Sequence, residues 1–333
     1  MKFPPRLTLP KFVSELNKRS KQVRIVRDPD NFDDSIRGGV LTVGNFDGVH
    51  RGHGRILATA REMSTRLQGP AIVFTFEPHP LRFLRPDAEP ARLSWLEQKA
   101  ELLATHGIDF LVAYPTTPEL LQLEYTVFFE EILLRQFGIR GMVEGPNFSF
   151  GRNREGTPER LRELTRSANV ELEIVPLLGT DDEVVSSSLI RRLISDGKIE
   201  EANDRLGHDY QLIGTVVKGD QRGRELGFPT ANLDDCPVLV PGYGVYAGSV
   251  VLGDDHWAAA VHIGPNPTFG DPQRKIEIHL IDFQGDLYGK RLNVSLHRQV
   301  RGVRTFDSAQ QLMQQLSQDV EAIRIVHASH RNA

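Results

Sequence analysis

The chain has 333 residues, of which 39% are hydrophobic and 25% charged; these fractions exclude a mainly disordered protein, and the length indicates two domains. The formal net charge of −4 argues against a general nucleic-acid binder, and the sequence shows neither a secretory signal nor an apolar run near the roughly 20 residues that span a bilayer. A single cysteine, Cys236, excludes an internal disulfide, so we expect a cytoplasmic protein without membrane or nucleic-acid partners.

Residues 1–38 are polar, with five basic residues between Lys18 and Arg27. We expect this N-terminal extension to form a solvated helix and a linker that packs on the first domain. Phosphate binding by the basic patch is a second, minor interpretation.

From Gly39 onwards, short apolar runs rich in β-branched residues alternate with helical patterns. Strands are predicted at residues 40–43, 71–76, 109–114, 141–143 and 172–175, and helices at 56–67, 94–106, 119–137 and 158–168. Such alternation predicts a Rossmann-like α/β domain with a parallel sheet. Ligands of these sheets bind beyond the carboxyl ends of the strands.

The pattern changes near residue 206, after two helices predicted at 189–195 and 199–206. Short strands separated by Gly, Pro and Asp turns follow at 212–217, 244–251, 256–263, 275–283 and 291–296, and an amphipathic helix at 307–326. This spacing predicts a small antiparallel barrel or sandwich. We therefore expect domains at residues 39–206 and 207–333.

The loop after the first strand reads G-N-F-D-G-V-H-R-G-H at residues 44–53. Its glycines allow a tight turn and close approach to a ligand. His50 and His53 lie where a strand leads into a helix N-terminus, which attracts phosphate, and their imidazoles could hydrogen-bond charge that builds on a phosphoryl group. Metal ligation is a weaker interpretation without a third nearby ligand, and a Gly-rich turn with surface histidines is the structural alternative.

This string resembles the signature of the nucleotidylyltransferase superfamily, and in particular that of the bacterial bifunctional riboflavin kinase/FAD synthetases. Residues 74–80, 145–156 and 185–191 are similar to further motifs of that family. The resemblance implies that His50 and His53 contact the ATP phosphates and that Asn147 helps to place the reactants. It also implies nucleotide binding by Gly44, Phe46, Asp47, Gly48, Ser187, Ser188 and Arg191.

The chemistry of residues 186–191 agrees with those roles. Ser187 and Ser188 precede a predicted helix, so hydroxyl and backbone N–H groups can converge on one anion, and Arg191 adds a bidentate fork. An ordinary helix N-cap is the alternative. Two positions depart from the family pattern, because Ser188 replaces the usual Thr and Leu189 replaces a common Arg.

A second glycine-rich segment covers residues 218–232. Its glycines, Gly219 and Gly223 among them, permit close approach to phosphates, Lys218 and Arg224 add positive charge, and the segment lacks the Gly-Lys-Ser/Thr ending of a Walker A loop. Thr230 and Asn232 offer neutral oxygen ligands that suit Mg²⁺. A hairpin with surface charge is the alternative, but G-F-P-T-A-N at 227–232 resembles the hallmark of the riboflavin kinase family.

Residues 241–246, 263–270 and 276–283 are also similar to that family. The pattern alone would make Glu277 an exposed strand residue, whereas the resemblance implies that it is the general base for the riboflavin 5′-hydroxyl. We expect His279 to support or pack. Arg301 matches a family arginine near the flavin, but Val303 and Arg304 stand where the family often carries an acid.

The resemblance covers about residues 39–326 and implies a bifunctional transferase. It would use ATP and Mg²⁺ to convert riboflavin to FMN and then FMN to FAD, as a monomer or weak homo-oligomer. The main alternative is a riboflavin kinase with a weak or inactive adenylyltransferase half. Adenylylation of another phosphorylated cofactor and a non-enzymatic flavin-binding module are further alternatives.

Overall fold

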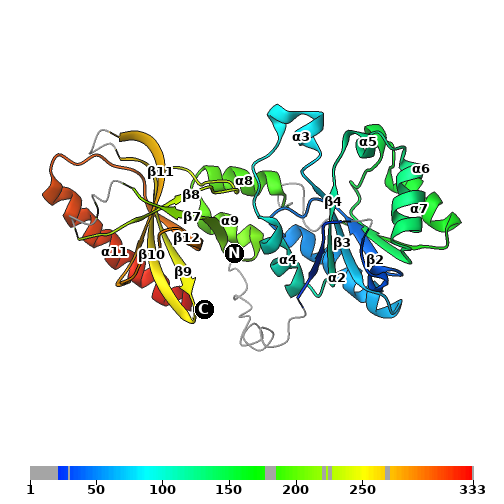
Figure 1. The fold of residues 1–333 in the computed structure, drawn as a ribbon, viewed down its shortest axis with the longest axis horizontal. Helices are drawn as coiled ribbons and strands as arrows, with labels where there is room; N and C mark the ends of the chain where they lie inside the picture. The colour runs from blue at the N-terminus through cyan, green and yellow to red at the C-terminus, as the bar shows by residue number, and fades with distance from the viewer. Residues whose placement is uncertain are drawn as a thin grey trace, which may run out of the picture. The chain divides into compact units, whose positions relative to one another are not determined.

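The computed structural model describes residues 22–28, 31–176, 185–219, 223, 227–266 and 271–331. Contacts divide the chain into two compact units (Figure 1). Unit 1 comprises Met1–Pro90 and Leu96–Val185, and unit 2 comprises Ala91–Trp95 and Ser186–Ala333. The helices between residues 186 and 206 thus group with unit 2, while the domain boundary near residue 206 stays a prediction. Within the described part of the chain, no helix is long and apolar enough to cross a membrane.

Unit 1 contains a six-stranded sheet with the order β1-β4-β3-β2-β5-β6, and every pair in it is parallel. This confirms the expected α/β fold. The strands are β1 (Arg24–Val26), β2 (Val40–Val43), β3 (Ala71–Glu77), β4 (Phe110–Pro115), β5 (Gly141–Glu144) and β6 (Glu171–Ile174). Around them lie α2 (Arg51–Arg66), α3 (Leu81–Leu84), α4 (Leu96–Thr105), α5 (Pro118–Leu121), α6 (Tyr125–Val127) and α7 (Pro158–Ser167). Short 3₁₀ turns are η1 (Asp34–Ile36), η2 (Pro86–Ala88) and η4 (Arg152–Arg154), and η3 (Phe128–Gln136) is π-helical.

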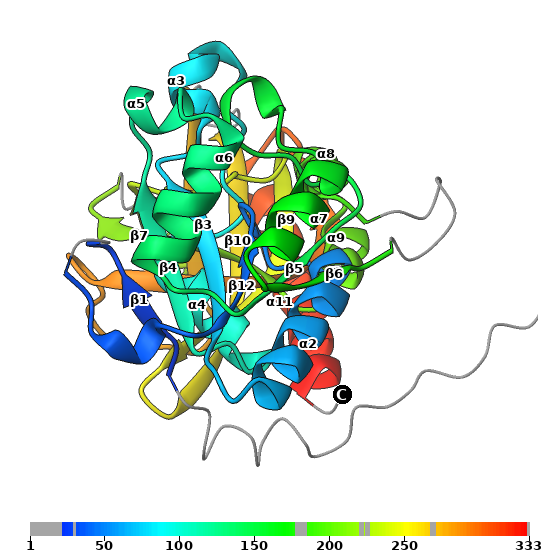
Figure 2. The same ribbon diagram turned by 90° about the vertical axis from the view of Figure 1, so that its right-hand side faces the viewer.

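Helices lie on both faces of this sheet (Figure 2), and because successive side chains along a strand point to opposite faces, both faces are buried. On one face, Leu41 and Phe74 pack with Phe129 of η3 in one core cluster. On the other face, Val73 packs with Leu57 of α2 in a second cluster. Because both faces are covered by helices, the loops at the strand ends are the places where the sheet can reach a ligand.

Two expectations for unit 1 were wrong. The segment expected as a helix and linker contains β1, which pairs with β4 and places Arg24 over the Phe110 ring at 5.1 Å. Residues 1–21 lie outside the described residues. The helix expected at 119–137 is interrupted, because the Leu123 carbonyl accepts a hydrogen bond from the Arg152 N–H at 2.7 Å.

Unit 2 contains a closed barrel with the order β10-β11-β8-β7-β12-β9. All its pairs are antiparallel, which confirms the expected barrel. Its strands are β7 (Tyr210–Val217), β8 (Ala231–Asp234), β9 (Gly244–Leu252), β10 (Asp255–Asn266), β11 (Asp271–Leu280) and β12 (Arg291–Arg301). Its helices are α8 (Ser187–Ser195), α9 (Ile199–Leu206) and α11 (Ala309–Arg331).

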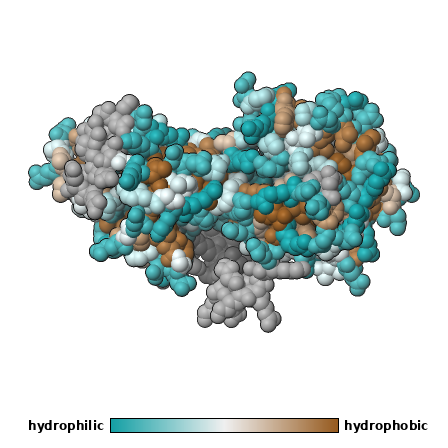
Figure 3. Space-filling view, viewed as in Figure 1, coloured by the Kyte–Doolittle hydropathy of each residue, from teal (hydrophilic) through white to brown (hydrophobic). Residues whose placement is uncertain are grey.

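The terminal helix α11 packs on the barrel wall, where its Ile323 is buried with Ala247 and Ile281. Strand β8 was not expected from the sequence, because it is only four residues long and contains Asn and Asp, which are poor strand formers. On the face that Figure 3 shows, hydrophilic residues surround separate hydrophobic patches, which is ordinary for a folded domain surface.

Candidate active sites

Strand β2 lies where the order of successive strands in the sheet of unit 1 reverses. The chain continues from β2 through β3 to β4 on one side, and β5 and β6 lie on the other side. Ligands of open α/β sheets bind where two neighbouring strands lead to opposite sides in this way. The loop at 44–50 follows β2, and the exposed Asn147 follows β5, so two predicted motifs leave the sheet at this switch point.

The loop after β2 has an unusual backbone. Phe46, Gly48 and Val49 have φ angles of 43°, 76° and 39°, and a β-branched residue such as Val49 is strained at positive φ, at a cost of about 1–3 kcal/mol. Phe46, Val49 and Asp47 are all buried. The Gly44 N–H donates to the Phe74 carbonyl at 2.9 Å, which fixes the start of the loop on β3. Strain held by packing is typical of functional loops.

The two histidines of this loop stack on each other. His50 is the N-cap residue of α2, and its ring centroid lies 3.6 Å from that of His53. The Phe46 ring lies 4.8 Å from His53 on centroids. Burial, followed by the proximity of His50 and Lys99, holds the pKa of His53 well below its usual value. His53 is therefore neutral near pH 7 and acts there as a hydrogen-bonding group rather than as a cation.

Gly52 makes room for the segment that leads into the serine motif. A Cβ atom on Gly52 would lie only 2.8 Å from the Val185 carbonyl oxygen, so Val185 lies directly against the first turn of α2. Ser187 and Ser188 follow Val185 closely in the sequence and begin α8, while the Ser186 hydroxyl accepts from the Leu189 N–H at 3.3 Å.

Arg191, in the first turns of α8, donates from Nε to the Ala91 carbonyl at 2.7 Å. Ala91, Ser187, Ser188 and Arg191 all belong to unit 2, whereas His50 and His53 belong to unit 1. The residues that the sequence assigns to nucleotide binding therefore belong partly to unit 1 and partly to unit 2.

Two charged residues near this loop were not singled out from the sequence. Lys99, which is buried, donates from Nζ to the Asn45 carbonyl at 2.7 Å. Glu144 is 2% exposed, and its Oε1 accepts from the Val43 N–H at 2.7 Å. Burial raises the pKa of Glu144 well above its ordinary value. Its sequence signal was a carboxylate that directly follows an apolar strand.

A second group of predicted residues meets on the barrel. Glu277 of β11 lies directly across from Asn232 of β8 in the strand register. A Cβ on Gly219 would lie 2.1 Å from Asn232 Nδ2, and one on Gly223 would lie 3.4 Å from Thr230 Oγ1. Gly219 and Gly223 therefore lie close to the two predicted metal ligands, and glycine at 219 leaves space for the Asn232 amide.

A pocket of about 540 Å³ opens beside Thr230. Its walls come from the ends of β8 and β11 and from the loop after β11, and they include Ile278, Leu280, Phe283, Leu287 and Tyr288. Lys218 Nζ lies 5.9 Å from the centroid of the Tyr288 ring. Apolar walls with one polar edge suit a flat aromatic ligand that carries a polar chain. Arg224 lies outside the described residues.

The sequence did not single out His262 of β10, which is a close neighbour of Glu277. Its Nδ1 lies 3.3 Å from Glu277 Oε2 across the β10–β11 ladder, and the Glu277 side chain is 19% exposed. His279 instead lies 2.8 Å through Nδ1 from the Pro229 carbonyl oxygen. Glu277 is thus partly exposed and has a polar neighbour on each adjacent strand, His262 on β10 and Asn232 on β8.

Arg301, at the end of β12, binds a carboxylate from the terminal helix. Its Nε and Nη2 donate to Asp319 of α11 at 3.0 and 2.7 Å, and Nη1 donates to the Gly302 carbonyl at 3.0 Å. The side chains of Arg301 and Asp319 are 11% and 4% exposed. An acid distant in sequence thus orients the arginine, where the nearby residues 303 and 304 offer none.

Residues 33–189 match the family model described as FAD synthetase, and residues 206–327 match that described as riboflavin kinase. A bifunctional riboflavin kinase/FMN adenylyltransferase from Pseudomonas fluorescens is 35% identical over 93% of this chain and 100% of its own length. One from Escherichia coli strain K12 is 32% identical over 89% of this chain and 96% of its own length. A crystal structure titled as a macrolide-efflux protein from Streptococcus pneumoniae aligns with a TM-score of 0.79 at 27% identity, covering 91% of this chain and 99% of that one.

Proposed function

Because the chain belongs to the family of bifunctional riboflavin kinase/FMN adenylyltransferases, we propose that it catalyses both steps from riboflavin to FAD. One ATP phosphorylates riboflavin to FMN, and a second ATP adenylylates FMN to FAD with release of pyrophosphate. The observation that carries this proposal is that a single chain holds both motif sets, one at a parallel-sheet switch point and the other on the barrel, where Thr230 lines a pocket. Relatives that carry both names support two activities rather than a kinase alone.

For the kinase step, Glu277 acts as general base. Its carboxylate takes the proton of the riboflavin 5′-hydroxyl, the hydroxyl oxygen attacks the γ-phosphorus of ATP, and ADP leaves. His262 orients the Glu277 carboxylate from 3.3 Å. The apolar pocket beside Thr230 receives the flavin ring, and Lys218 and the glycine-rich segment contact the ATP phosphates.

The hydroxyl of Thr230 and the amide oxygen of Asn232 fit the preference of Mg²⁺ for oxygen ligands, and glycine at 219 gives the Asn232 side chain its space. These two residues would hold the ion, whose charge would neutralise part of the phosphate charge of ATP. Arg301, oriented by Asp319, contacts the bound flavin.

For the adenylyl step, no protein nucleophile is needed. The FMN phosphate attacks the α-phosphorus of ATP, the bond to the β-phosphate oxygen breaks, and pyrophosphate leaves. Residues 44–48 and the helix N-terminus at His50 hold the phosphates, while N–H groups of His50 and His53 stabilise the charge that develops. Asn147 places the reactants, and Ser187, Ser188 and Arg191 bind phosphate oxygens.

We assign the adenylyl step to residues 39–206 and the kinase step to residues 207–333. Because ATP supplies both groups, we also propose a cytoplasmic location, and we expect a monomer or weak homo-oligomer. Sedimentation of the purified chain tests the last expectation.

Product analysis tests the proposed function. The full chain is incubated with ATP, Mg²⁺ and either riboflavin or FMN, and FMN and FAD are resolved over time. Glu277→Ala should abolish FMN formation and leave the conversion of FMN to FAD intact, whereas His53→Ala should do the reverse.

A mixture of the two variants provides the control for folding, because FMN released by one can be used by the other and FAD should again form from riboflavin. If the wild-type chain makes FMN but no FAD at high enzyme concentration, only the kinase half is active. Loss of both activities in either single variant would contradict the separate sites.

A further inference from the structure

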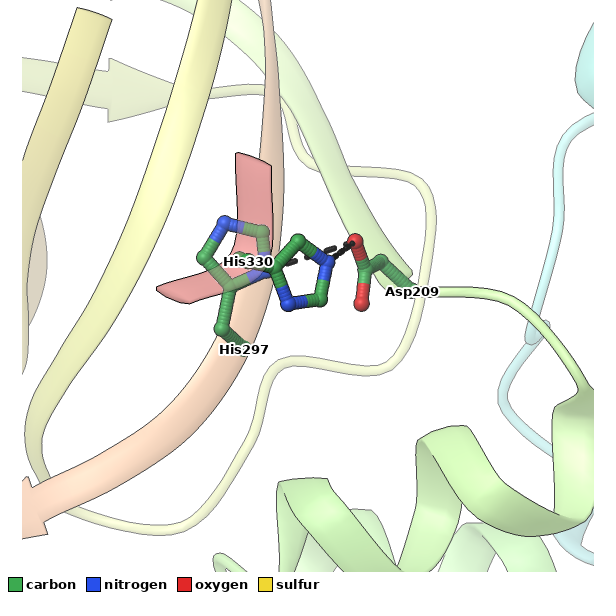
Figure 4. A group of neighbouring side chains, drawn as sticks. All are labelled: Asp209, His297 and His330. Atoms are coloured by element: carbon green, nitrogen blue, oxygen red, sulfur yellow. Dashed lines mark hydrogen bonds and ion pairs between the residues drawn. The ribbon is translucent and has the colours of Figure 1, made fainter. Parts of the chain in front are cut away.

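Three side chains from distant parts of the chain meet beside the barrel of unit 2 (Figure 4). Asp209 directly precedes β7, His297 lies in β12 and His330 lies near the end of α11. One ligand atom from each, a carboxylate oxygen and two imidazole nitrogens, can be chosen so that all three lie within 4.8 Å of one another. This group belongs wholly to unit 2.

The carboxylate is the centre of the group. Asp209 Oδ2 lies 3.3 Å from His297 Nδ1 and 2.8 Å from His330 Nε2. The other oxygen, Oδ1, accepts a hydrogen bond from Asn203 Nδ2 at 3.1 Å. Asp209 therefore points one oxygen at two imidazoles.

Two features of His297 suit a metal ligand, its burial and the contact of its Nε2 with a hydroxyl, and an ordinary ion pair requires neither. Its side chain is only 3% exposed, and its Nε2 lies 3.0 Å from the Ser249 hydroxyl. When Nε2–H donates to Ser249 Oγ, Nδ1 carries the lone pair, as in metal-bound histidines whose second nitrogen is held by an oxygen. This Nδ1 is buried and lies 3.3 Å from Asp209 Oδ2, so both atoms can approach one ion.

His330 is the third member of the group, and its ring packs against that of His297 (Figure 4). Its ring lies 3.9 Å from that of His297 on centroids, and its side chain is 47% exposed, which leaves an access path from solvent. Three protein ligands with an accessible fourth position are typical of a four-coordinate zinc site that keeps a water molecule.

From this geometry we propose that Asp209, His297 and His330 form a binding site for a divalent transition metal ion of the zinc class. Two imidazole nitrogens and one carboxylate oxygen suit Zn²⁺ and disfavour Mg²⁺, which prefers oxygen ligands throughout. The site is thus chemically distinct from the Mg²⁺ requirement of the kinase step. Ser249 and Asn203 act as outer partners that orient the ligands.

A metal ion here would fasten α11 to the barrel. Asp209 directly precedes strand β7 and His297 lies in strand β12, whereas His330 lies on the helix α11. The same helix carries Asp319, which orients Arg301. Occupancy of the site therefore stabilises the helix that holds a proposed flavin-contacting residue, and it makes the stability of unit 2 depend on the metal concentration.

Zinc titration of the full chain, prepared without a histidine tag and freed of metal by a chelator, tests this proposal. Binding is measured by competition with a chromophoric chelator, and Co²⁺ serves as a spectroscopic probe of four-coordinate geometry. We expect one tight ion per chain. Asp209→Asn and His330→Gln should each weaken binding more than about 100-fold, and Ser249→Ala should weaken it about 10–100-fold, with recovery in Ser249→Thr.

Matched controls separate this site from the other histidines. His327→Gln removes an imidazole one turn earlier on α11 and should bind zinc as the wild type does. His53→Ala should also leave the tight site unchanged. Hydrogen exchange at residues 309–331 should slow when zinc is added to the wild type and should not respond in His330→Gln, whose substitution at an exposed helix end spares the fold.

Wild-type affinity in either Asp209→Asn or His330→Gln would overturn the proposal, and so would the absence of a tight one-to-one complex. Loss of the tight ion in His53→Ala, with binding retained in His330→Gln, would place the metal in unit 1 and would also overturn it. These outcomes are independent of FMN and FAD formation, so failure here leaves the proposed enzyme activities untouched.

Discussion

His262 Nδ1 lies 3.3 Å from Glu277 Oε2, directly across the β10–β11 ladder. Both side chains are mostly buried, at 23% and 19% exposure. A general base must hold its carboxylate toward the hydroxyl that it deprotonates, and the strand register gives Glu277 a neighbour that can do this. The residue assigned as base and its orienting partner thus come from adjacent strands.

His262→Gln should lower kcat for riboflavin phosphorylation about 10-fold, a modest part of what general-base catalysis contributes, with little change in the KM for riboflavin. The reason is that the carboxylate loses its orientation while the flavin pocket is retained. Steady-state kinetics check this split. His256→Gln, an exposed histidine on the same strand, is the matched control. An equal loss of FMN adenylylation would contradict a role confined to the barrel.

Gly219→Ala should raise the Mg²⁺ concentration needed for half-maximal FMN formation. The new Cβ would lie 2.1 Å from Asn232 Nδ2, so the amide must move out of its position. The measurement is FMN formation as a function of Mg²⁺ at saturating ATP. Gly302→Ala is the control, because its Cβ would meet nothing within 4 Å. An unchanged Mg²⁺ dependence in Gly219→Ala would argue against Asn232 as a ligand.

Asp319→Asn should destabilise unit 2 by about 3–5 kcal/mol, because it leaves the buried Arg301 charge without its carboxylate. Both tryptophans, Trp95 and Trp257, belong to unit 2, so tryptophan fluorescence during urea unfolding reports on this unit. Flavin affinity should fall in parallel.

The exposed pair of Arg324 and Asp282 offers a comparison, since their side chains are 45% and 64% exposed. Asp282→Asn should cost less than about 1 kcal/mol. A similar loss in the two variants would show that burial does not set the strength of the Arg301–Asp319 pair.

Glu144→Gln should remove a pH dependence from the stability of unit 1. Because burial raises the pKa of Glu144 in the folded state, the folded protein keeps a proton that the unfolded chain releases above its ordinary value of 4.5. The contribution of Glu144 to the free energy of unfolding of wild-type unit 1 therefore falls as the pH rises from about 4.5 toward the raised pKa.

Glutamine accepts the same hydrogen bond from the Val43 N–H and does not titrate. Relative to the wild type, Glu144→Gln should thus gain stability with rising pH, which hydrogen exchange of peptides covering β2 can follow. A stability difference that stays constant across this range would mean that Glu144 titrates alike in both states.

Local patterns predicted much of the fold. The apolar, β-branched run at β2 was expected at residues 40–43 and is observed there, since a strand buried on both faces shows itself in its own sequence. β1 and β8 were not foreseen, because strands of three and four residues carry too little pattern and depend on their neighbours in the sheet. Their presence is a consequence of tertiary pairing.

The residues of the candidate sites also divide into those that the sequence predicts and those that only the fold brings together. Glu277 and His50 were found because they lie in long motifs, and their roles stay predictions. Three buried or partly buried polar residues that contact the motifs or the strands before them, namely His262, Glu144 and Asp319, come from other strands and helices. Strand register and helix packing decide which side chains meet, and neither is encoded in the spacing along one segment.

The closed barrel has a further consequence for self-association. A strand at the edge of a sheet offers unpaired N–H and C=O groups to other chains, and closure pairs every strand of the β10-β11-β8-β7-β12-β9 ring on both sides. Among the described strands, open edges are therefore confined to β1 and β6 of the parallel sheet. β1 has three residues and carries Arg24, and β6 carries Glu171 and Glu173. Short, charged edges discourage aggregation by strand addition, even at the high concentrations of overexpression.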